Sequence, residues 1–407
     1  MFFDIKSWNN KISSKEFQNN KKEIRKLLDL RNNKKLLNEF NFLNQDIKLL
    51  KKKIFDISKV FMGFEKILLL GTGGSSLGSK AILEAASNDK IIFIENIDPK
   101  YVLKKVKSVK EKKILLIIIS KSGETSEVIS LYQVIINYFT NIFNFKKNII
   151  IITEEKNSTL YKLCKEKKIK FIEHNSKIGG RFSCFSETGL IPVKLAGLNS
   201  NYIKTLSDNI TKECLYNNQF SLAENISILY HFIKNSKYVG HTVLSYQDSL
   251  NPLVMWYRQL WGESLGKQGK GVHIIPATGS IDQHSQLQMW LDGPDDLFYT
   301  IIIPKKRKID FKLTDNTKFL PAYLNKKKLG DVLNTMAIAT YKELVRVGKP
   351  VRVIYLDDDS LYPAIKLMSF FMLEVAFLGK YLGVNPFDQP AVEKVKLLTK
   401  KLLINNA

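Results

Sequence analysis

Two segments rich in glycine and hydroxyl side chains have the composition of phosphate-binding loops. The first runs from Gly71 to Gly78 (GTGGSSLG) and the second from Ser120 to Ser126 (SKSGETS). Each follows an apolar run and precedes a stretch of helical character. Glycine lets the backbone approach an anion, and the free N–H groups at a helix start attract it. With hydroxyl donors added, the two segments could form one phosphate cradle.

The first segment can be compared with three kinds of loop. A dinucleotide-binding loop needs glycine where Ser76 stands, although Glu95 lies at a suitable distance for a ribose. A P-loop needs lysine directly after Gly78, where the chain has Ser79. A sugar-phosphate loop needs small and hydroxyl residues, which Ser75 and Ser76 supply. A tight strand-to-helix turn is the structural alternative here, and ordinary N-capping is the alternative for the second segment.

Two further segments carry a cation and a carboxylate. GGRFS offers Arg181 beside paired glycines, and WGESLGK offers Glu263 between two glycines. A carboxylate in such surroundings can serve as a general base with a tuned pKa. The structural alternatives are an arginine in a solvated loop and a helix end marked by glycine.

The last two segments carry a histidine and a polar helical pattern. His284, within GSIDQHSQ, could transfer protons near neutral pH, although a lone histidine is often structural. PFDQP opens an expected helix on which Gln389, Glu393 and Lys396 have the spacing of one face. These three side chains could meet a polyol, or Glu393 and Lys396 could form a surface ion pair.

The elements that must position these groups follow an α/β pattern. Short isoleucine-rich runs predict strands buried on both faces of a parallel sheet, at Ile67–Leu70, Ile91–Ile94, Ile114–Ile119, Asn148–Thr153 and Ile169–Ile172. Helices are predicted between them at Ser79–Ala86, Glu124–Phe143 and Thr159–Lys167, the last capped by Ser158. The alternation predicts a doubly wound fold.

A second α/β unit of the same kind is predicted after about residue 200. Its strands are expected at Tyr238–Ser245, Val272–Pro276, Leu297–Ile303 and Val351–Leu356. Its helices are expected at Leu250–Leu260, Gln283–Leu291, Leu361–Leu382 and Pro390–Ile404. We therefore predict an N-terminal helical arm (1–50), a first domain with the phosphate loops (51–200) and a second domain with C-terminal helices (201–407).

Composition limits the classes of protein. The 407 residues carry a net charge of +24, and 44% are hydrophobic, which excludes a disordered or collagen-like chain. Only seven of the 63 cations are arginine, and lysine is spread along the chain rather than clustered, which favours a solvated surface over a nucleic-acid site. A positive field would still raise the on-rate of an anionic substrate.

Three scattered cysteines fit a reducing cytosol rather than a disulfide framework or a metal site. No targeting segment is evident at the start, and the longest apolar runs are far shorter than the ~20 residues of a membrane span. We expect a cytoplasmic protein that binds neither membrane nor nucleic acid.

Taken together and in this order, the six segments resemble the glucose-6-phosphate isomerase family. The resemblance runs from about Lys66 to Lys400. It is strongest in the Glu-x-x-Gly-Lys string at Glu263, the turn with His284, and the string from Phe387 to Lys396. It implies two sugar-isomerase (SIS-type) domains and reversible conversion of glucose 6-phosphate to fructose 6-phosphate, in glycolysis and gluconeogenesis. It also implies a homodimer whose active site takes the histidine from the partner subunit.

The resemblance also implies roles for individual residues. Those that would hold the phosphate are Gly74, Ser75, Ser120, Lys121, Ser122 and Thr125. Glu263 would move a proton between C2 and C1, and Arg181 would stabilise the enediolate. His284 and Lys396 would assist ring opening, and Gln389 would position the sugar. Such an isomerisation requires no redox cofactor and no metal.

Glu124 departs from the family pattern, because it adds a negative charge to the phosphate loop. We expect its side chain to point away or to cap a helix. Other functions stay open: an SIS-type isomerase of mannose or amino-sugar phosphates, a sugar-phosphate-binding module without catalysis, or a nucleic-acid binder motivated by the charge.

Overall fold

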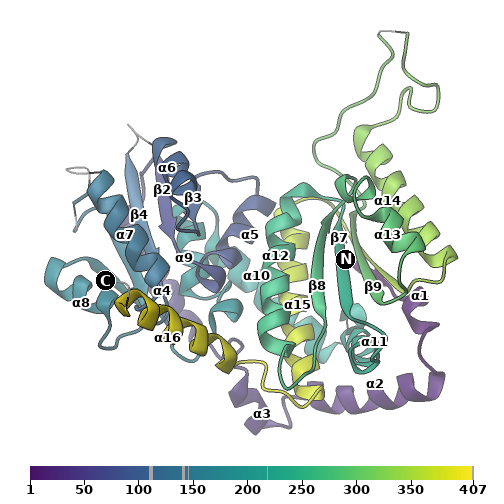
Figure 1. Ribbon diagram of the computed structural model, residues 1–407, viewed down its shortest axis with the longest axis horizontal. Helices are drawn as coiled ribbons and strands as arrows, with labels where there is room; N and C mark the ends of the chain where they lie inside the picture. Colours follow the sequence, from purple (N-terminus) through teal and green to yellow (C-terminus); the bar gives the residue numbers. More distant parts are fainter. Residues whose placement is uncertain (110–112, 140–142, 145, 218, 317, 406–407) are drawn as a thin grey trace.

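The computed structural model describes residues 1–109, 113–139, 143–144, 146–217, 219–316 and 318–405. Two five-stranded sheets lie side by side, and helices that include α5, α10, α12 and α15 fill the space between them (Figure 1). The protein thus has the α/β architecture with two sheets that the apolar runs predict.

The first sheet is parallel throughout, in the order β3-β2-β4-β5-β6. Its strands are β2 (Lys66–Leu70), β3 (Ile91–Ile94), β4 (Ile114–Ile119), β5 (Ile149–Thr153) and β6 (Lys170–Glu173). All six residues of β4 are buried, as in a strand covered on both faces. Because β2 pairs with β4, the loops that follow these two strands lie next to each other at the carboxyl edge, where open sheets bind ligands.

The five predicted strands of this sheet are confirmed, and three of its six described helices were predicted, one with the same bounds and two with shifted ends. The helices are α5 (Leu77–Ala85), α6 (Pro99–Lys107), α7 (Ser126–Tyr138), α8 (Thr159–Lys167), α9 (Glu187–Leu195) and α10 (Ser200–Tyr216). Helix α7 begins at Ser126, so Glu124 lies in the loop before it, and part of the predicted end of this helix lies outside the described residues. Ser158 caps α8 as predicted, accepting from the N–H of Tyr161 at 3.4 Å.

The second sheet has the order β1-β10-β9-β7-β8. Its strands are β1 (Phe2–Asp4), β7 (Gly240–Ser245), β8 (His273–Thr278), β9 (Leu297–Pro304) and β10 (Val351–Leu356). β7 to β10 are parallel and match the predicted strands, whereas β1 runs antiparallel at the edge beside β10. The N-terminal arm is helical as predicted except for this strand, whose three residues are too few to show strand periodicity.

The helices around this sheet and before it complete the fold. Those after the first unit are α11 (Leu222–Lys234), α12 (Asn251–Leu265), α13 (Leu287–Asp292), α14 (Leu329–Arg346), α15 (Leu361–Tyr381) and α16 (Pro390–Asn405). Those of the N-terminal segment are α1 (Lys6–Asn9), α2 (Ser14–Leu28), α3 (Lys34–Glu39) and α4 (Ile47–Phe61). Helix α12 continues to Leu265, beyond its predicted end, and so includes Glu263. The proposed boundaries near residues 50 and 200 stay predictions.

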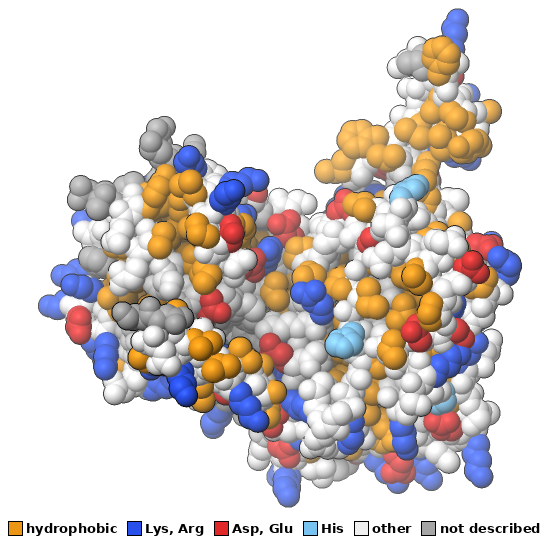
Figure 2. Space-filling model, in the orientation of Figure 1, with side chains coloured by type: hydrophobic (Ala, Val, Ile, Leu, Met, Phe, Trp, Pro, Cys, Tyr) orange, Lys and Arg blue, Asp and Glu red, His pale blue; other side chains and the backbone are white. Residues whose placement is uncertain are grey.

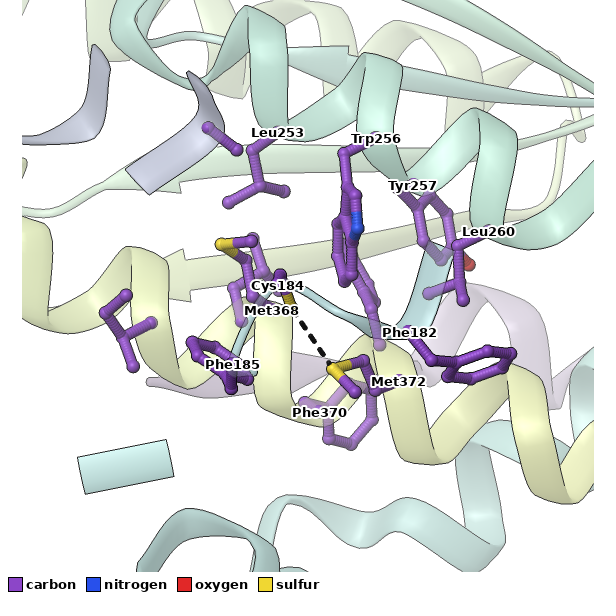
Figure 3. Packing of buried hydrophobic residues seen from close by; sticks show 14 of the residues in the cluster. Phe182, Cys184, Phe185, Leu253, Trp256, Tyr257, Leu260, Met368, Phe370 and Met372 are labelled. Atoms are coloured by element: carbon purple, nitrogen blue, oxygen red, sulfur yellow. Dashed lines mark hydrogen bonds between the residues drawn. The ribbon is translucent and has the colours of Figure 1, made fainter. Parts of the chain in front are cut away.

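Helices α12 and α15 form the middle of the core (Figure 3). Trp256 and Tyr257 of α12 are fully buried, and the ring of Tyr257 stacks on Phe371 of α15 with centroids 3.9 Å apart. Among the described residues, α15 alone has the length and composition to cross a membrane, but 83% of its most apolar stretch is buried inside the protein. It is the central helix of the core, and it holds α12 in place.

Two segments extend away from this core. Residues 305–316 and 318–328 project beyond α13 and α14 and carry exposed hydrophobic side chains, of which Phe319 is 90% exposed (Figures 1 and 2). Helix α16 has no buried residue, and Val395, Leu398 and Leu402 are exposed along it. Both segments present apolar surface that this chain leaves uncovered.

Candidate active site

A buried arginine is the centre of the candidate site. Arg181 lies in the 3-10 turn η2 (Gly180–Phe182), after β6, and its side chain is 1% exposed. Its Nε donates a hydrogen bond to Ser264 Oγ at 2.8 Å, and its Nη1 donates to Glu263 Oε2 at 3.1 Å and to Gln389 Oε1 at 2.9 Å. Three segments that are distant in the sequence therefore meet at one guanidinium group.

The remaining donors of Arg181 hold the loop before α16. Its Nη2 donates to the carbonyl oxygens of Pro386 at 2.7 Å and Asp388 at 2.8 Å. Lys267 fixes the same loop, because its Nζ lies 2.9 Å from the carboxylate of Asp388 and donates to the carbonyl of Asn385. All five N–H groups of the guanidinium are thus used, and the arginine is held in one position.

Glu263 is bound at both of its carboxylate oxygens. Oε1 accepts from Gln259 Nε2 at 2.9 Å, and Oε2 accepts from Arg181. Gln259 lies one turn earlier on α12, so the helix presents the two side chains together. The side chain of Glu263 is 28% exposed, which leaves the carboxylate accessible beside a buried cation. Burial lowers the pKa of Arg181, and the charge of Glu263 opposes that shift.

The first glycine-rich segment packs directly on this pair. A Cβ on Gly74 would come within 2.2 Å of the carbonyl carbon of Gly180, so the two loops touch backbone to backbone. Gly73 has a φ of +55°, and a Cβ there would lie 2.8 Å from Gln259 Nε2. Glycine is needed at Gly74 because of the close backbone approach and at Gly73 because of the positive φ. The partly exposed Ser75 ends the 3-10 turn η1 (Gly73–Ser75) beside this contact.

The second hydroxyl-rich segment forms a tight loop between β4 and α7. Ser120 Oγ lies 2.7 Å from Thr125 Oγ1 and accepts from the N–H of Gly123 at 3.2 Å. Ser122 Oγ accepts from the N–H of Glu124 at 3.2 Å. Since β2 and β4 are neighbours, this loop and the Gly71–Gly78 segment open at the same edge of the sheet.

Glu124 turns away from this loop, as expected. Its Oε1 accepts a hydrogen bond from the N–H of Thr159 at 2.5 Å. The hydroxyl group of Thr159 lies within hydrogen-bond distance of both carboxylate oxygens, 3.1 Å from Oε1 and 3.0 Å from Oε2. Thr159 is the first residue of α8. The carboxylate thus caps the start of a neighbouring helix, where negative charge is favourable.

Lys121 reaches across to the chain that leads to Arg181. Its Nζ donates to the carbonyl oxygens of Ser176 at 2.7 Å and Ile178 at 3.1 Å, and it lies 3.8 Å from Glu154 Oε1. Burial lowers the pKa of Lys121, while the charge of Glu154 opposes the shift.

His284 and Lys396 lie apart from the Arg181–Glu263 pair. His284 is exposed and follows the 3-10 turn η5 (Ile281–Gln283), so the predicted helix from Gln283 in fact begins later, at Leu287. Lys396 is exposed on α16 and donates to Glu393 Oε1 at 2.7 Å, the surface ion pair considered as an alternative. In the described part of this single chain, neither side chain bonds to Arg181 or Glu263.

Gln389 differs from its predicted placement. It precedes α16, which begins at Pro390, so it does not share a helical face with Glu393 and Lys396. Its amide oxygen instead accepts from Arg181. The loop therefore brings Gln389 into the site, while the helix carries the other two side chains over the surface.

Three residues that contact the site were not singled out for a role: Gln259, Ser264 and Lys267. The spacing of Gln259 and Glu263, i and i+4 on one helix, was a usable signal. Glu95 has a structural role in place of a ribose contact, because it accepts from Ser76 Oγ at 2.6 Å and from Lys80 at 2.5 Å. Among the described residues, no group of three His, Cys, Asp or Glu side chains has the arrangement of a metal site.

The chain is similar to known proteins over most of its length. The sequence profile of the family described as "Phosphoglucose isomerase" matches residues 31–288. A glucose-6-phosphate isomerase of Campylobacter jejuni is 33% identical over 353 residues, covering 83% of this chain and 85% of the relative. One of Thermus thermophilus is 32% identical over 350 residues, covering 83% and 84%.

Solved structures resemble the fold as well. A Thermus thermophilus protein described as hypothetical superposes with a TM-score of 0.82 at 28% identity, and 94% of each chain is covered. A glucose-6-phosphate isomerase of Chlamydia trachomatis superposes with a TM-score of 0.73 at 20% identity, covering 87% of this chain and 72% of the other. The family match spans more than half of the chain, and the curated relatives align over most of it. The chain therefore belongs to the phosphoglucose isomerase family.

Proposed function

We propose that the protein interconverts glucose 6-phosphate and fructose 6-phosphate through an enediolate, as a step of glycolysis and gluconeogenesis. The observation that carries this proposal is the contact of Glu263 with Arg181, at 3.1 Å, beside two loops of phosphate-cradle composition. An aldose–ketose isomerisation needs a base and a cation near the developing oxyanion. Glu263 carries the negative charge in a partly open position, and the buried guanidinium of Arg181 supplies the positive charge beside it.

Glu263 acts as the base in this mechanism. It takes the proton from C2 of the open-chain aldose; the electron pair of that bond forms the C1–C2 double bond, and the carbonyl electrons move to O1. The guanidinium of Arg181 offsets the negative charge of the enediolate. Return of the proton to C1, with passage of the hydroxyl proton from O2 to O1, gives the ketose. No atom or electron is gained or lost overall.

The phosphate is assigned to the loops at the carboxyl edge of the first sheet. The hydroxyl groups of Ser75, Ser120, Ser122 and Thr125 and the backbone at Gly74 would supply neutral donors, and the start of α7 adds free N–H groups. Holding the phosphate there would position C1 and C2 against Glu263, and binding remote from the reacting atoms lowers the barrier in this way.

Ring opening is assigned to His284 and Lys396. Because both side chains lie apart from Arg181 and Glu263 in a single chain, this assignment supports association of two copies of the chain. Both side chains are exposed in a single chain, so a partner subunit's histidine could complete the site. The uncovered apolar side chains of residues 305–316 and 318–328 and of α16 support such a homodimer, because large exposed patches mark interaction surfaces. Light scattering of the purified protein measures the mass directly, and a monomer at assay concentrations would contradict this assignment.

The cytoplasm is the proposed site of action, consistent with three free cysteines that are all buried. The net charge of +24 is assigned to solvated lysine side chains rather than to nucleic-acid binding. Affinity for DNA or RNA that decreases steeply with salt would contradict that assignment.

The deciding experiment supplies the purified protein with glucose 6-phosphate, without added metal, and follows fructose 6-phosphate. Mannose 6-phosphate and glucosamine 6-phosphate are assayed in parallel, because other SIS-type isomerases act on such substrates. Turnover of glucose 6-phosphate at a kcat in the ordinary range of about 1–10³ per second supports the proposal. Tight binding of hexose phosphates without turnover would favour a non-catalytic module instead.

A further inference from the structure

Lys121 stands within the hydroxyl-rich loop, between Ser120 and Ser122, yet its ammonium group is directed elsewhere. Nζ donates to the carbonyl oxygens of Ser176 and Ile178, at 2.7 and 3.1 Å, and its third donor faces Glu154 Oε1 at 3.8 Å. An ammonium group has three N–H donors. All three therefore face oxygen atoms of the protein.

The carbonyls that Lys121 binds belong to the segment that leads to Arg181. Ile178 is three residues before Arg181 and is buried, and Gly179 and Gly180 complete the connection. Because two consecutive glycines give the backbone high conformational freedom, the position of the arginine depends on how firmly the chain before them is held. Lys121 holds that chain at two carbonyl groups that are two residues apart.

The same segment is anchored at its start by a second buried group. The carboxylate of Glu187, which is 4% exposed, accepts from the N–H of Asn175 at 2.5 Å. His174 is 1% exposed, and its Nδ1 lies 3.0 Å from the carbonyl of Asn175. The segment is thus fixed at residue 175 from one side and at residues 176 and 178 from the other.

We infer that Lys121 is a positioning residue, whose ammonium group ties the phosphate loop to the segment carrying Arg181 and leaves phosphate binding to the hydroxyl groups around it. The inference rests on the proposed function, since it concerns the same reaction. It means that a phosphate bound in the loop and the guanidinium at the reacting carbons are held at a fixed separation. Such a separation matters because a displacement of 1 Å can cost about 10²-fold in rate.

The test compares Lys121→Met with two controls. Lys156→Met removes a cation that pairs with the other oxygen of Glu154, at 2.5 Å, but has no bond to residues 174–178. Ser122→Ala removes a hydroxyl assigned to the phosphate. For each protein we would measure kcat, KM and two inhibition constants. One inhibitor is inorganic phosphate, and the other is a phosphorylated five-carbon sugar hydroxamate that mimics the enediolate.

We expect Lys121→Met to lower kcat by about 10- to 100-fold and to weaken the enediolate mimic by a similar factor. In Lys121→Met, the inhibition constant of inorganic phosphate should stay within about 2-fold of the wild-type value. Ser122→Ala should raise this constant, and Lys156→Met should leave kcat, KM and both inhibition constants near the wild-type values. A large rise in the phosphate inhibition constant of Lys121→Met, with kcat unchanged, would make Lys121 a phosphate ligand and overturn the inference. Unchanged constants throughout would overturn it too.

Two further measurements keep these outcomes distinct. If Lys121→Met does not fold, Lys121→Arg replaces it, because arginine retains the cation but changes its reach; the same loss of kcat without loss of phosphate binding is expected. A wild-type protein that turns over no hexose phosphate would refute the proposed function itself. An active wild type with fully active Lys121 variants would refute only the positioning role.

Discussion

Replacing Glu263 with glutamine separates the chemistry of the carboxylate from its packing. Glutamine has nearly the same shape, and its amide oxygen can still accept from Arg181. The NH₂ group of the new glutamine would face Gln259 Nε2, and this contact is unfavourable because both groups are hydrogen-bond donors. Gln259 resolves this by a flip, because its Oε1 is buried without a hydrogen-bond partner in the described structure and can then accept from the new amide.

The two costs of Glu263→Gln differ in size. Arg181 keeps four of its hydrogen bonds and exchanges a charged acceptor for a neutral one, at a site that is 28% exposed, so the loss of folding stability should be about 1–2 kcal/mol. Loss of a general base costs about 10²- to 10⁴-fold in rate, or about 3–5 kcal/mol of barrier. Catalysis should therefore collapse in a protein that stays folded.

The assay combines turnover, exchange and binding. Coupled assays in both directions give kcat, and NMR in D₂O follows exchange of the C2 proton, which requires the base even when the net reaction is slow. Binding of fructose 6-phosphate, measured by calorimetry, should stay within about 10-fold of wild type, because the phosphate loops are unchanged. Ser264→Ala is the matched control, since it removes one hydrogen bond from the same guanidinium and leaves the base in place. A kcat within 10-fold of wild type in the folded glutamine variant, or normal C2 exchange, would refute the role of Glu263.

Three other changes test the structure around the site. Arg181→Lys offers three donors where five are used, so buried acceptors lose partners; we expect about 2 kcal/mol or more of lost stability in urea unfolding and about 10²- to 10³-fold lower kcat. Equal stability would show that the five bonds are unimportant. Glu124→Ala removes one of the two side chains that cap α8, the other being Ser158, and should cost about 0.5–2 kcal/mol without raising KM, because the carboxylate points away from the phosphate loop; a higher KM would place Glu124 in binding. Burial raises the pKa of the Cys164 thiol to about 12 and those of the other two thiols as well, so thiol reagents at pH 8 should label the protein only after denaturation. Rapid labelling of the native protein would contradict that burial.

The secondary structure was largely predictable because it depends on neighbouring residues. The isoleucine-rich runs became the parallel strands, and the run at Ile114–Ile119 became a strand with the same bounds. Three long helices, α10, α11 and α14, were not predicted, and other errors occurred where the local signal was short. Strand β1, of three residues, was missed, and α13 began four residues later than the first residue of its predicted helix, after a 3-10 turn.

The sequence pointed to Arg181 and Glu263 in the candidate site, but not to most of the side chains that hold them by hydrogen bonds. Arg181 and Glu263 stand in two of the six segments whose joint order resembles a family, so the sequence pointed to them through that resemblance. Gln259 and Ser264 have ordinary residue types, and their contacts arise only when α12 packs beside the Arg181 loop. The link from Lys121 to residues 176 and 178 is likewise a contact between loops, with no periodicity to reveal it.

The sequence by itself determined which chemical groups are available, where most strands lie along the chain, and at which edge of the first sheet the two phosphate-type loops open. Only the tertiary structure decided that Gln389 bonds to Arg181 across 208 positions, and that Glu124 caps a neighbouring helix. The reason is physical. Strand and helix patterns arise from the repeat of the backbone over a few residues, whereas the direction of a long polar side chain depends on which distant acceptors packing brings within about 3 Å of it.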